Sequence, residues 1–194
     1  MKFLIFDLEA TCWESHVSHL YQQEIIEIGA CIMNHYGEIE STFTSLVKPN
    51  IHKFLSPYCK NLTQIEQSEI NKAKTFPEVL DRFFDWAEIP DENYGFCAWG
   101  SADYKMILTD CQLHNIETDW LIPYIDIKSQ YHKNKDLKKL MSLEKVLQKN
   151  GFEFEGQRHR ALPDTLNLAK LVYKYRDDWG IFYHYFILKQ YTNR

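Results

Sequence analysis

The feature that most constrains this chain is a short apolar run near its start that ends in two acidic residues. Residues 3–6 are Phe-Leu-Ile-Phe, and Asp7 and Glu9 follow them. Such a run predicts a buried strand, in which residues two apart point to the same face. Paired carboxylates repel each other unless a divalent cation lies between them, and after Lys2 the next Lys or Arg is Lys48. We therefore expect a metal site at the end of a central strand.

The pair alone does not decide the chemistry. Chance gives about one Asp-x-Glu in a chain with 12 Asp and 15 Glu among 194 residues, and solvated strand-end acids are the alternative. Further along, Asp103 falls in the first turn of an expected helix, where the helix dipole favours an anion. His159 precedes Asp164 by five residues, at the start of a later helix. The repeat of this spacing at His114 is expected to be a coincidence, because it falls at a helix end.

The apolar periodicity predicts one α/β domain over residues 1–194, with a mixed five-stranded sheet and helices on both faces. The strands are expected at 3–6, 24–33, 39–47, 96–99 and 124–127. The helices are expected to start near residues 76, 101, 142, 161 and 179. Residues 48–74 lack clear periodicity, so we expect a long excursion with short helical turns.

Composition excludes several classes of protein. The hydrophobic share of 45% and the aromatic share of 15% argue against disorder. No apolar run approaches the roughly 20 residues of a membrane span, and the N-terminal run is too short for a signal peptide. We expect a cytoplasmic protein with no membrane contact. The five cysteines form no C-x-x-C pair, which disfavours zinc, and Cys31 and Cys97 are expected to be buried reduced thiols.

The net charge of −5 hides an uneven distribution. Between Lys128 and Arg160 there are nine Lys or Arg residues and four acids, so this segment carries +5 and the remainder −10. A solvated helical face explains such an excess without any function. The alternative is that the segment guides a polyanion toward His159, which lies at its end.

Taken together, these motifs resemble the DEDDh branch of the DnaQ-like exonucleases. Longer matches resemble its histone-mRNA and small-RNA exonuclease group, with the bacterial KapD-type relatives. They are Phe6-Asp7-Leu8-Glu9-Ala10-Thr11-Cys12-Trp13-Glu14, Gln23-Glu24-Ile25-Ile26-Glu27-Ile28-Gly29-Ala30, Ala98-Trp99-Gly100-Ser101-x-Asp103 and Leu55-Ser56-Pro57-Tyr58-Cys59-Lys60-Asn61-Leu62-Thr63. The resemblance covers nearly the whole chain and implies an RNase H-like fold. Gln64, Ala98 and Pro163 depart from the group's usual residues, but none of these departures removes a metal ligand.

The resemblance implies a 3′-5′ exonuclease that releases 5′-mononucleotides. Four carboxylates, from Asp7, Glu9, Asp103 and Asp164, would hold two Mg²⁺ or Mn²⁺ ions, with Asp7 bridging them. His159 would accept the proton of the attacking water as a general base.

The substrate would be the 3′ end of a single-stranded nucleic acid, and we favour RNA over DNA. Trp13 and Trp99 are candidate platforms for base stacking, although Trp99 also suits the core. The backbone of Ala10 and Thr11 is a candidate contact for the terminal sugar. Lys128 and Arg160 are candidate phosphate contacts. A DNA-directed proofreading or repair exonuclease and a non-catalytic RNA- or nucleotide-binding module remain as alternatives, and no protein partner is indicated.

Overall fold

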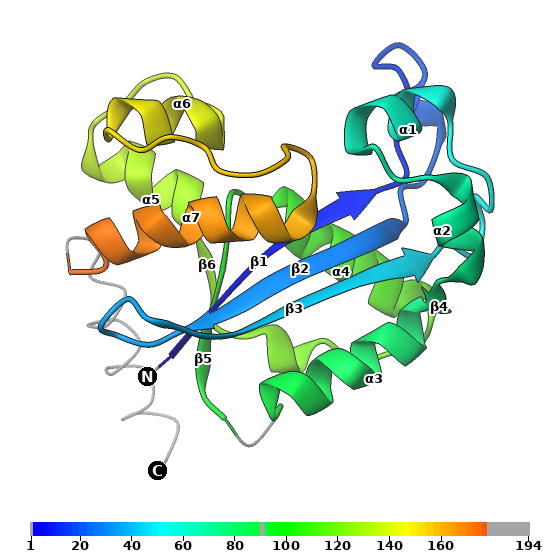
Figure 1. Cartoon of the computed structure of the whole chain (residues 1–194), viewed down its shortest axis with the longest axis horizontal. Coiled ribbons are helices and arrows are strands. Elements are labelled where there is room, and N and C mark those ends of the chain that lie inside the picture. Colours follow the sequence, from blue (N-terminus) through cyan, green and yellow to red (C-terminus); the bar gives the residue numbers. More distant parts are fainter. Residues whose placement is uncertain (1, 90–91, 178–194) are drawn as a thin grey trace.

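A six-stranded mixed sheet forms the centre of the protein (Figure 1), in a computed structural model that describes residues 2–89 and 92–177. The strand order is β4-β3-β2-β1-β5-β6. Strand β2 runs antiparallel to both β1 and β3, whereas β1, β5 and β6 are parallel. The carboxyl ends of β1 and β5 therefore meet at one edge of the sheet, which is where the acidic pair was expected.

The bounds of the elements follow the apolar pattern closely. The strands are β1 (Lys2–Ala10), β2 (Ile25–Met33), β3 (Ile39–Lys48), β4 (Lys74–Thr75), β5 (Tyr94–Ala98) and β6 (Tyr124–Asp126). The helices are α1 (Pro57–Thr63), α2 (Gln67–Lys72), α3 (Phe76–Ala87), α4 (Ala102–Leu113), α5 (Ile127–Asn134), α6 (Leu143–Lys149) and α7 (Ala161–Tyr175). Two short 3₁₀ turns lie at Ser18–Leu20 and Asp119–Leu121.

Local signals explain where several elements begin. The Asn34 side chain accepts hydrogen bonds from the amides of Tyr36 and Glu38, which closes the hairpin between β2 and β3. Helix α3 starts with the expected capping box between Thr75 and Glu78. At the start of α6, the Ser142 hydroxyl accepts a hydrogen bond from the third amide of the helix.

The alternation along β1 divides the core into two layers. Leu4, Phe6 and Leu8 pack against α3 and α4. The intervening residues, Phe3 and Ile5, pack against α5, α6 and α7 on the opposite face, and Figure 1 shows these helices gathered on one side of the sheet. Because side chains two apart share a face, the residues that continue this second face toward the end of the strand are the two acids. They therefore point toward α7.

Helix α7 lies exceptionally close to strand β2. A Cβ atom added at Gly29 would lie 2.2 Å from the carbonyl carbon of Ala161 and from the amide nitrogen of Leu162. The Thr165 hydroxyl also donates a hydrogen bond to the Gly29 carbonyl, at 2.9 Å. Glycine is therefore required at this position of β2, and the first turn of α7 is fixed against the sheet.

Two expectations need correction. The sheet has six strands rather than five, because the two-residue β4 pairs with the end of β3 and is too short to leave a periodic signal. The fifth expected strand runs to residue 127, whereas β6 ends at Asp126 and helix α5 begins at Ile127. The excursion at 48–74 contains the short helical turns that were expected, as helices α1 and α2. The helix expected near residue 179 lies outside the described residues, and within them no helix is long and apolar enough to cross a membrane.

Candidate active site

Three carboxylates converge where β1 ends beneath α7. Asp7 and Glu9 come from β1 and Asp164 from the first turns of α7, and one ligand oxygen from each lies within 4.8 Å of the other two. The prediction that Asp7 and Glu9 share a face is confirmed. The chain between Glu9 and Asp164 spans most of the sequence, so the cluster depends on how closely α7 packs on the sheet.

Asp103 adjoins this cluster from a separate element. It lies in the first turn of α4, and only 5% of its surface is exposed. The backbone amides of Asp103 and Leu8 donate hydrogen bonds to its carboxylate, which is one reason why the group stays fixed. Among the neighbouring charges, that of Asp103 acts most strongly on Asp7. The four acids implied by the sequence therefore meet at the same edge of the sheet.

Burial and mutual repulsion raise the pKa of every acid in the group. Burial, then the charges of Asp103, Asp164, Glu9 and Glu27, raise the pKa of Asp7 well above its usual value. Burial first, and then the charge of Asp164, raise the pKa of Glu9 to about 8. Burial likewise raises the pKa of Asp103 to about 7 and that of Asp164 to about 6.

The size of this repulsion indicates what the cluster binds. Two unit charges 4.8 Å apart repel by about 3 kcal/mol at an effective dielectric constant of 20, which is a large part of a domain's stability. Either protons or a cation must offset it. The donors are carboxylate oxygens only, the set that Mg²⁺ and Mn²⁺ prefer. The residues present therefore fit a hard divalent cation.

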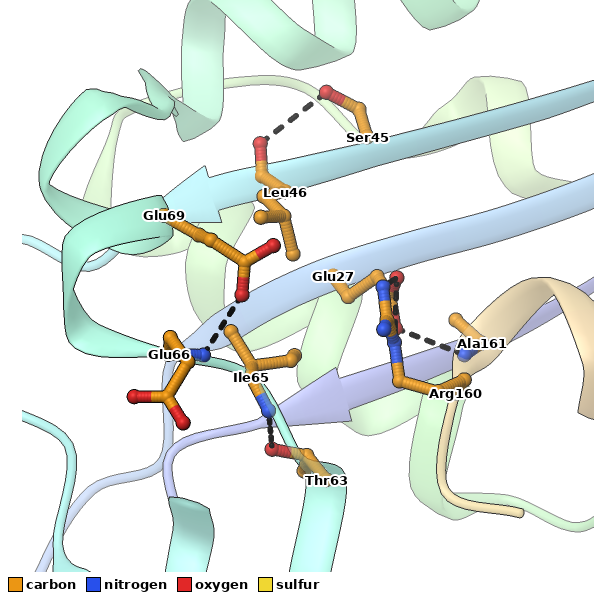
Figure 2. A network of polar contacts seen from close by, with 9 residues as sticks. All are labelled: Glu27, Ser45, Leu46, Thr63, Ile65, Glu66, Glu69, Arg160 and Ala161. Carbon is orange, nitrogen blue, oxygen red and sulfur yellow. Dashed lines mark hydrogen bonds and ion pairs between the residues drawn. The ribbon is translucent and has the colours of Figure 1, made fainter. Parts of the chain in front are cut away.

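A further acid, the buried Glu27, fixes the start of α7 through Arg160 and Ala161 (Figure 2). It lies opposite Glu9 in the β1–β2 ladder, and its side chain is 3% exposed. Both carboxylate oxygens accept hydrogen bonds from Arg160, at 2.7 to 3.1 Å, and the backbone amide of Ala161 donates a further one at 3.0 Å. Arg160 thus neutralises Glu27, and the pair holds the N-terminal turn of α7 against β2.

His159 lies in the turn just before α7, in a left-handed conformation with φ of 57°. Its backbone amide and that of Arg160 donate hydrogen bonds to the Asp164 carboxylate. The imidazole is exposed and, with Asp7, Glu9 and Asp164, lines a cavity of about 320 Å³. A histidine held in this way can reach a small molecule at the acids.

The same cavity contains one of the two predicted tryptophans. Trp99 forms part of its wall, and the indole nitrogen is buried without a hydrogen-bond partner among the described residues. Trp13 instead belongs to an aromatic group, with its ring centroid 4.5 Å from that of Tyr21 and 4.7 Å from that of His52. Tyr21 lines a second cavity of about 540 Å³ that reaches Glu9 and Ala10 from the α4 side.

The remaining predicted contacts are placed as follows. Thr11 is 2% exposed, and its hydroxyl accepts a hydrogen bond from the amide of Glu24. Lys128 lies on α5, where its side chain passes near Gly100 at the end of β5. Arg160 contributes its guanidinium to the Glu27 pair described above. Contacts of these residues with a substrate stay predictions.

Sequence reasoning missed Glu27 and part of the cavity wall. The wall also contains Ser142, Leu143, Glu144, Phe154 and Arg158. The signal for Glu27 was present, because it is a charged residue inside the otherwise apolar run Ile25–Met33, and a buried charge requires a partner. No comparable signal marked Ser142, Leu143 and Glu144, which lie more than 15 residues from the nearest of the acids in sequence.

Comparisons with known proteins agree with this geometry. The family model for Exonuclease, of the RNase T type, matches residues 4–172. The Homo sapiens protein named 3′-5′ exoribonuclease 1 is 32% identical over 182 residues, which cover 90% of this chain and 52% of the relative. The chain thus spans about half the length of that relative.

Two solved structures are also similar, each with 30% identity and a TM-score of 0.83. One is the nuclease domain of 3′hExo, described as a DEDDh family member bound to rAMP. The match covers 91% of this chain and 92% of that domain. The other is a 3′-exonuclease described as recognising the 3′ end of the histone mRNA stem-loop. The match covers 91% of this chain and 64% of that protein.

The raised pKa values predict that the metal-free protein loses stability as the pH rises. The folded acids bind protons that the unfolded chain has already released, so the free energy of unfolding falls between about pH 4.5 and 8. Glu9→Gln should reduce this fall by at least about 1 kcal/mol, or roughly 2–4 °C in Tm. Thermal unfolding in EDTA at pH 5.5 and pH 8 measures it. The matched control is Glu117→Gln, at an exposed acid, and an equal effect of both variants would refute the explanation.

The Glu27–Arg160 pair should contribute more than a surface ion pair. Glu27→Gln removes the counter-charge of a guanidinium that is 29% exposed and should destabilise the protein by about 2 kcal/mol. Chemical denaturation of this variant, Arg160→Gln and the double variant gives the coupling energy, which should exceed about 1 kcal/mol. The control pair is Lys2–Glu40, at 3.2 Å and about one third exposed, where Glu40→Gln should cost less than about 1 kcal/mol. Equal coupling in both pairs would contradict the assignment.

Proposed function

Because the chain belongs to the RNase T-type exonuclease family, we propose that it removes nucleotides one at a time from the 3′ end of single-stranded RNA. The observation that carries the proposal is the convergence of Asp7, Glu9 and Asp164 within 4.8 Å, with His159 lining the same cavity. The acids provide ligands for a metal, and the imidazole provides a proton acceptor. The product is a 5′-mononucleotide.

The acids have distinct roles in this proposal. Asp7 is half-buried in the cluster with Glu9 and Asp164, and among the neighbouring charges that of Asp103 acts on it most strongly, so it would be the ligand shared by two Mg²⁺ or Mn²⁺ ions. Glu9 and Asp164 would complete the shell on the side of the attacking water, and Asp103 would complete the other. Ions held in this way would activate water and stabilise the departing 3′ oxygen.

The proton of the attacking water passes to His159. The imidazole is exposed, which leaves it able to turn toward a water at the acids and then to release the proton to solvent. The backbone amide of His159 donates a hydrogen bond to the Asp164 carboxylate, so the turn that carries the imidazole is held in place by a proposed metal ligand. His159 and Asp164 thus have different roles in the proposal, but the position of one depends on the other.

The cavity provides contacts for the terminal nucleotide. Trp99 forms one wall, and an aromatic wall stacks on any base, which suits an enzyme that shortens chains of varied sequence. Ala10 borders the second cavity, and in this proposal the backbone of Ala10 and Thr11 contacts the terminal sugar. Trp13 stacks on Tyr21, which lines that cavity. Lys128 adds positive charge for the phosphates, and the exposed part of Arg160 can donate a hydrogen bond to a phosphate although Glu27 balances its charge.

RNA is favoured over DNA by the relatives. The human relative is named an exoribonuclease, and one similar structure holds rAMP, a ribonucleotide. The basic segment 128–160 includes α5, α6 and the approach to α7, so it borders the cavity at which an incoming polyanion must arrive. We infer a cytoplasmic location and a single domain over residues 1–194, supported by the five free thiols and the continuous sheet.

A degradation assay tests the proposal directly. Single-stranded RNA labelled at its 5′ end should shorten progressively from the 3′ end in Mg²⁺ or Mn²⁺ and release 5′-mononucleotides. EDTA should stop the reaction, and Asp7→Asn should abolish it while leaving the metal-free fold at least as stable, because one repelling charge is gone. Internal cuts, or degradation that survives EDTA, would overturn the proposal. Faster degradation of DNA of the same sequence would favour the repair enzyme, and binding without turnover would favour the binding module.

His159→Ala should lower kcat by roughly 10²–10⁴-fold, the usual contribution of a general base. Metal affinity, measured by calorimetry, should persist in His159→Ala and weaken in Asp164→Ala. The matched control is His114→Ala, because His114 and Asp119 repeat the spacing, whereas His114 ends α4 and stacks on Phe76. Equal losses in the two histidine variants would show that His159 is not the base.

A further inference from the structure

Two cysteines from distant parts of the sequence meet beside the acidic cluster. Cys12 follows Glu9 by three residues, just beyond β1, and Cys59 lies in the first turn of α1. Their side chains are hydrogen-bonded to each other, and the Cys59 thiol also contacts the carbonyl oxygen of Ala10 at 3.6 Å. A thiol pair therefore spans from the end of the metal-binding strand to the neighbouring helix.

The Ser56 hydroxyl joins the backbone of Cys12 to that of Cys59. The Ser56 hydroxyl donates a hydrogen bond to the Cys12 carbonyl at 2.5 Å and accepts one from the Cys59 amide at 2.9 Å. Both cysteines pack against the same apolar cluster, which includes Ile26 and Ile65. The pair is thus fixed by the fold, with the two thiols within hydrogen-bonding reach of each other.

A small oxidant can reach the pair from solvent. Cys59 is fully buried, but Cys12 is half-buried and lines the cavity of about 540 Å³ that also contains Glu9 and Ala10. The hydrogen bond from Cys12 lowers the pKa of the Cys59 thiol, which favours the reactive thiolate at that sulfur.

The other cysteines do not offer this arrangement. Cys31 and Cys97 lie opposite the same residue of β1, Ile5, on the two flanking strands. Two strand spacings separate them by roughly 9–10 Å, beyond the reach of a disulfide. Cys111 is buried in α4 within the other core layer.

We propose that Cys12 and Cys59 form a reversible disulfide when the protein meets hydrogen peroxide, which makes the pair a covalent modification site beside the metal ligands. The Cys12 thiol, which the oxidant can reach, attacks one peroxide oxygen, the O–O bond breaks, and a sulfenic acid at Cys12 and water result. Cys59 then attacks the Cys12 sulfur through its thiolate, and the released thiol proton leaves with the hydroxyl group as a second water. Two thiols are oxidised to one disulfide, and one peroxide is reduced to two waters.

The disulfide alters the metal site through the short segment between Glu9 and Cys12. Closing the bond draws Cys12 toward α1 and removes the thiol hydrogen from the Ala10 carbonyl, directly after the ligand Glu9. Metal ligands must stay within about 0.5 Å of their productive positions. Oxidation therefore slows the reaction by at least about 10-fold, a consequence that rests on the proposed function.

Mass spectrometry tests the modification without any substrate. The full chain is treated with hydrogen peroxide, alkylated and digested. The expected products are a linked Cys12–Cys59 peptide in the native protein, its loss on adding dithiothreitol, and its absence from Cys12→Ser and Cys59→Ala. Cys111→Ala is the matched control and should retain the link. Sulfinic acid at Cys12 without the linked peptide, or links that involve Cys111, would overturn the proposal.

Activity on RNA is measured on the same samples. A 10-fold fall that dithiothreitol reverses in the native protein, but that is absent in Cys12→Ser, supports the coupling to the metal site. A linked protein of unchanged rate overturns that coupling. If the reduced protein degrades no RNA, the proposed function fails, whereas the linked peptide still decides whether the modification site exists.

Discussion

The contact between the first turn of α7 and strand β2 is what the rest of the site depends on. It is possible only because Gly29 has no side chain, since a Cβ atom there would lie 2.2 Å from the backbone of Ala161. One helical turn further on, Asp164 reaches the two acids of β1. Any residue larger than glycine would move α7 outward, and a displacement of about 1 Å is enough to impair a metal site.

This proximity concentrates negative charge, and the fold offsets it in two ways. Glu27 has a permanent partner in Arg160, which makes the clamp at the start of α7 independent of any ligand. Within the described part of the chain, no basic side chain forms an ion pair with Asp7, Glu9, Asp103 or Asp164, and burial and repulsion raise their pKa values instead. The protein thus separates acids that hold the structure from acids that remain available to bind a cation.

The sequence indicated the site more fully than the architecture around it. The period-two pattern placed Asp7 and Glu9 on one face, and the resemblance to a known family joined them to His159 and Asp164 far along the chain. Strand β4 escaped notice because two residues carry no periodicity. The Glu27–Arg160 pair joins positions 133 residues apart, and no local spacing can reveal such a contact.

The position of His159 has a consequence for how such a protein can change over time. The acids lie on a strand and on helices whose packing fixes them, whereas the imidazole lies on a connecting turn, exposed and in a left-handed conformation. Turns tolerate substitution and insertion better than packed elements do. A lineage can therefore lose or replace the proposed proton acceptor without losing the fold or the cluster of acids. A single substitution of His159 could therefore convert such a protein into one that binds nucleic acid ends without cutting them.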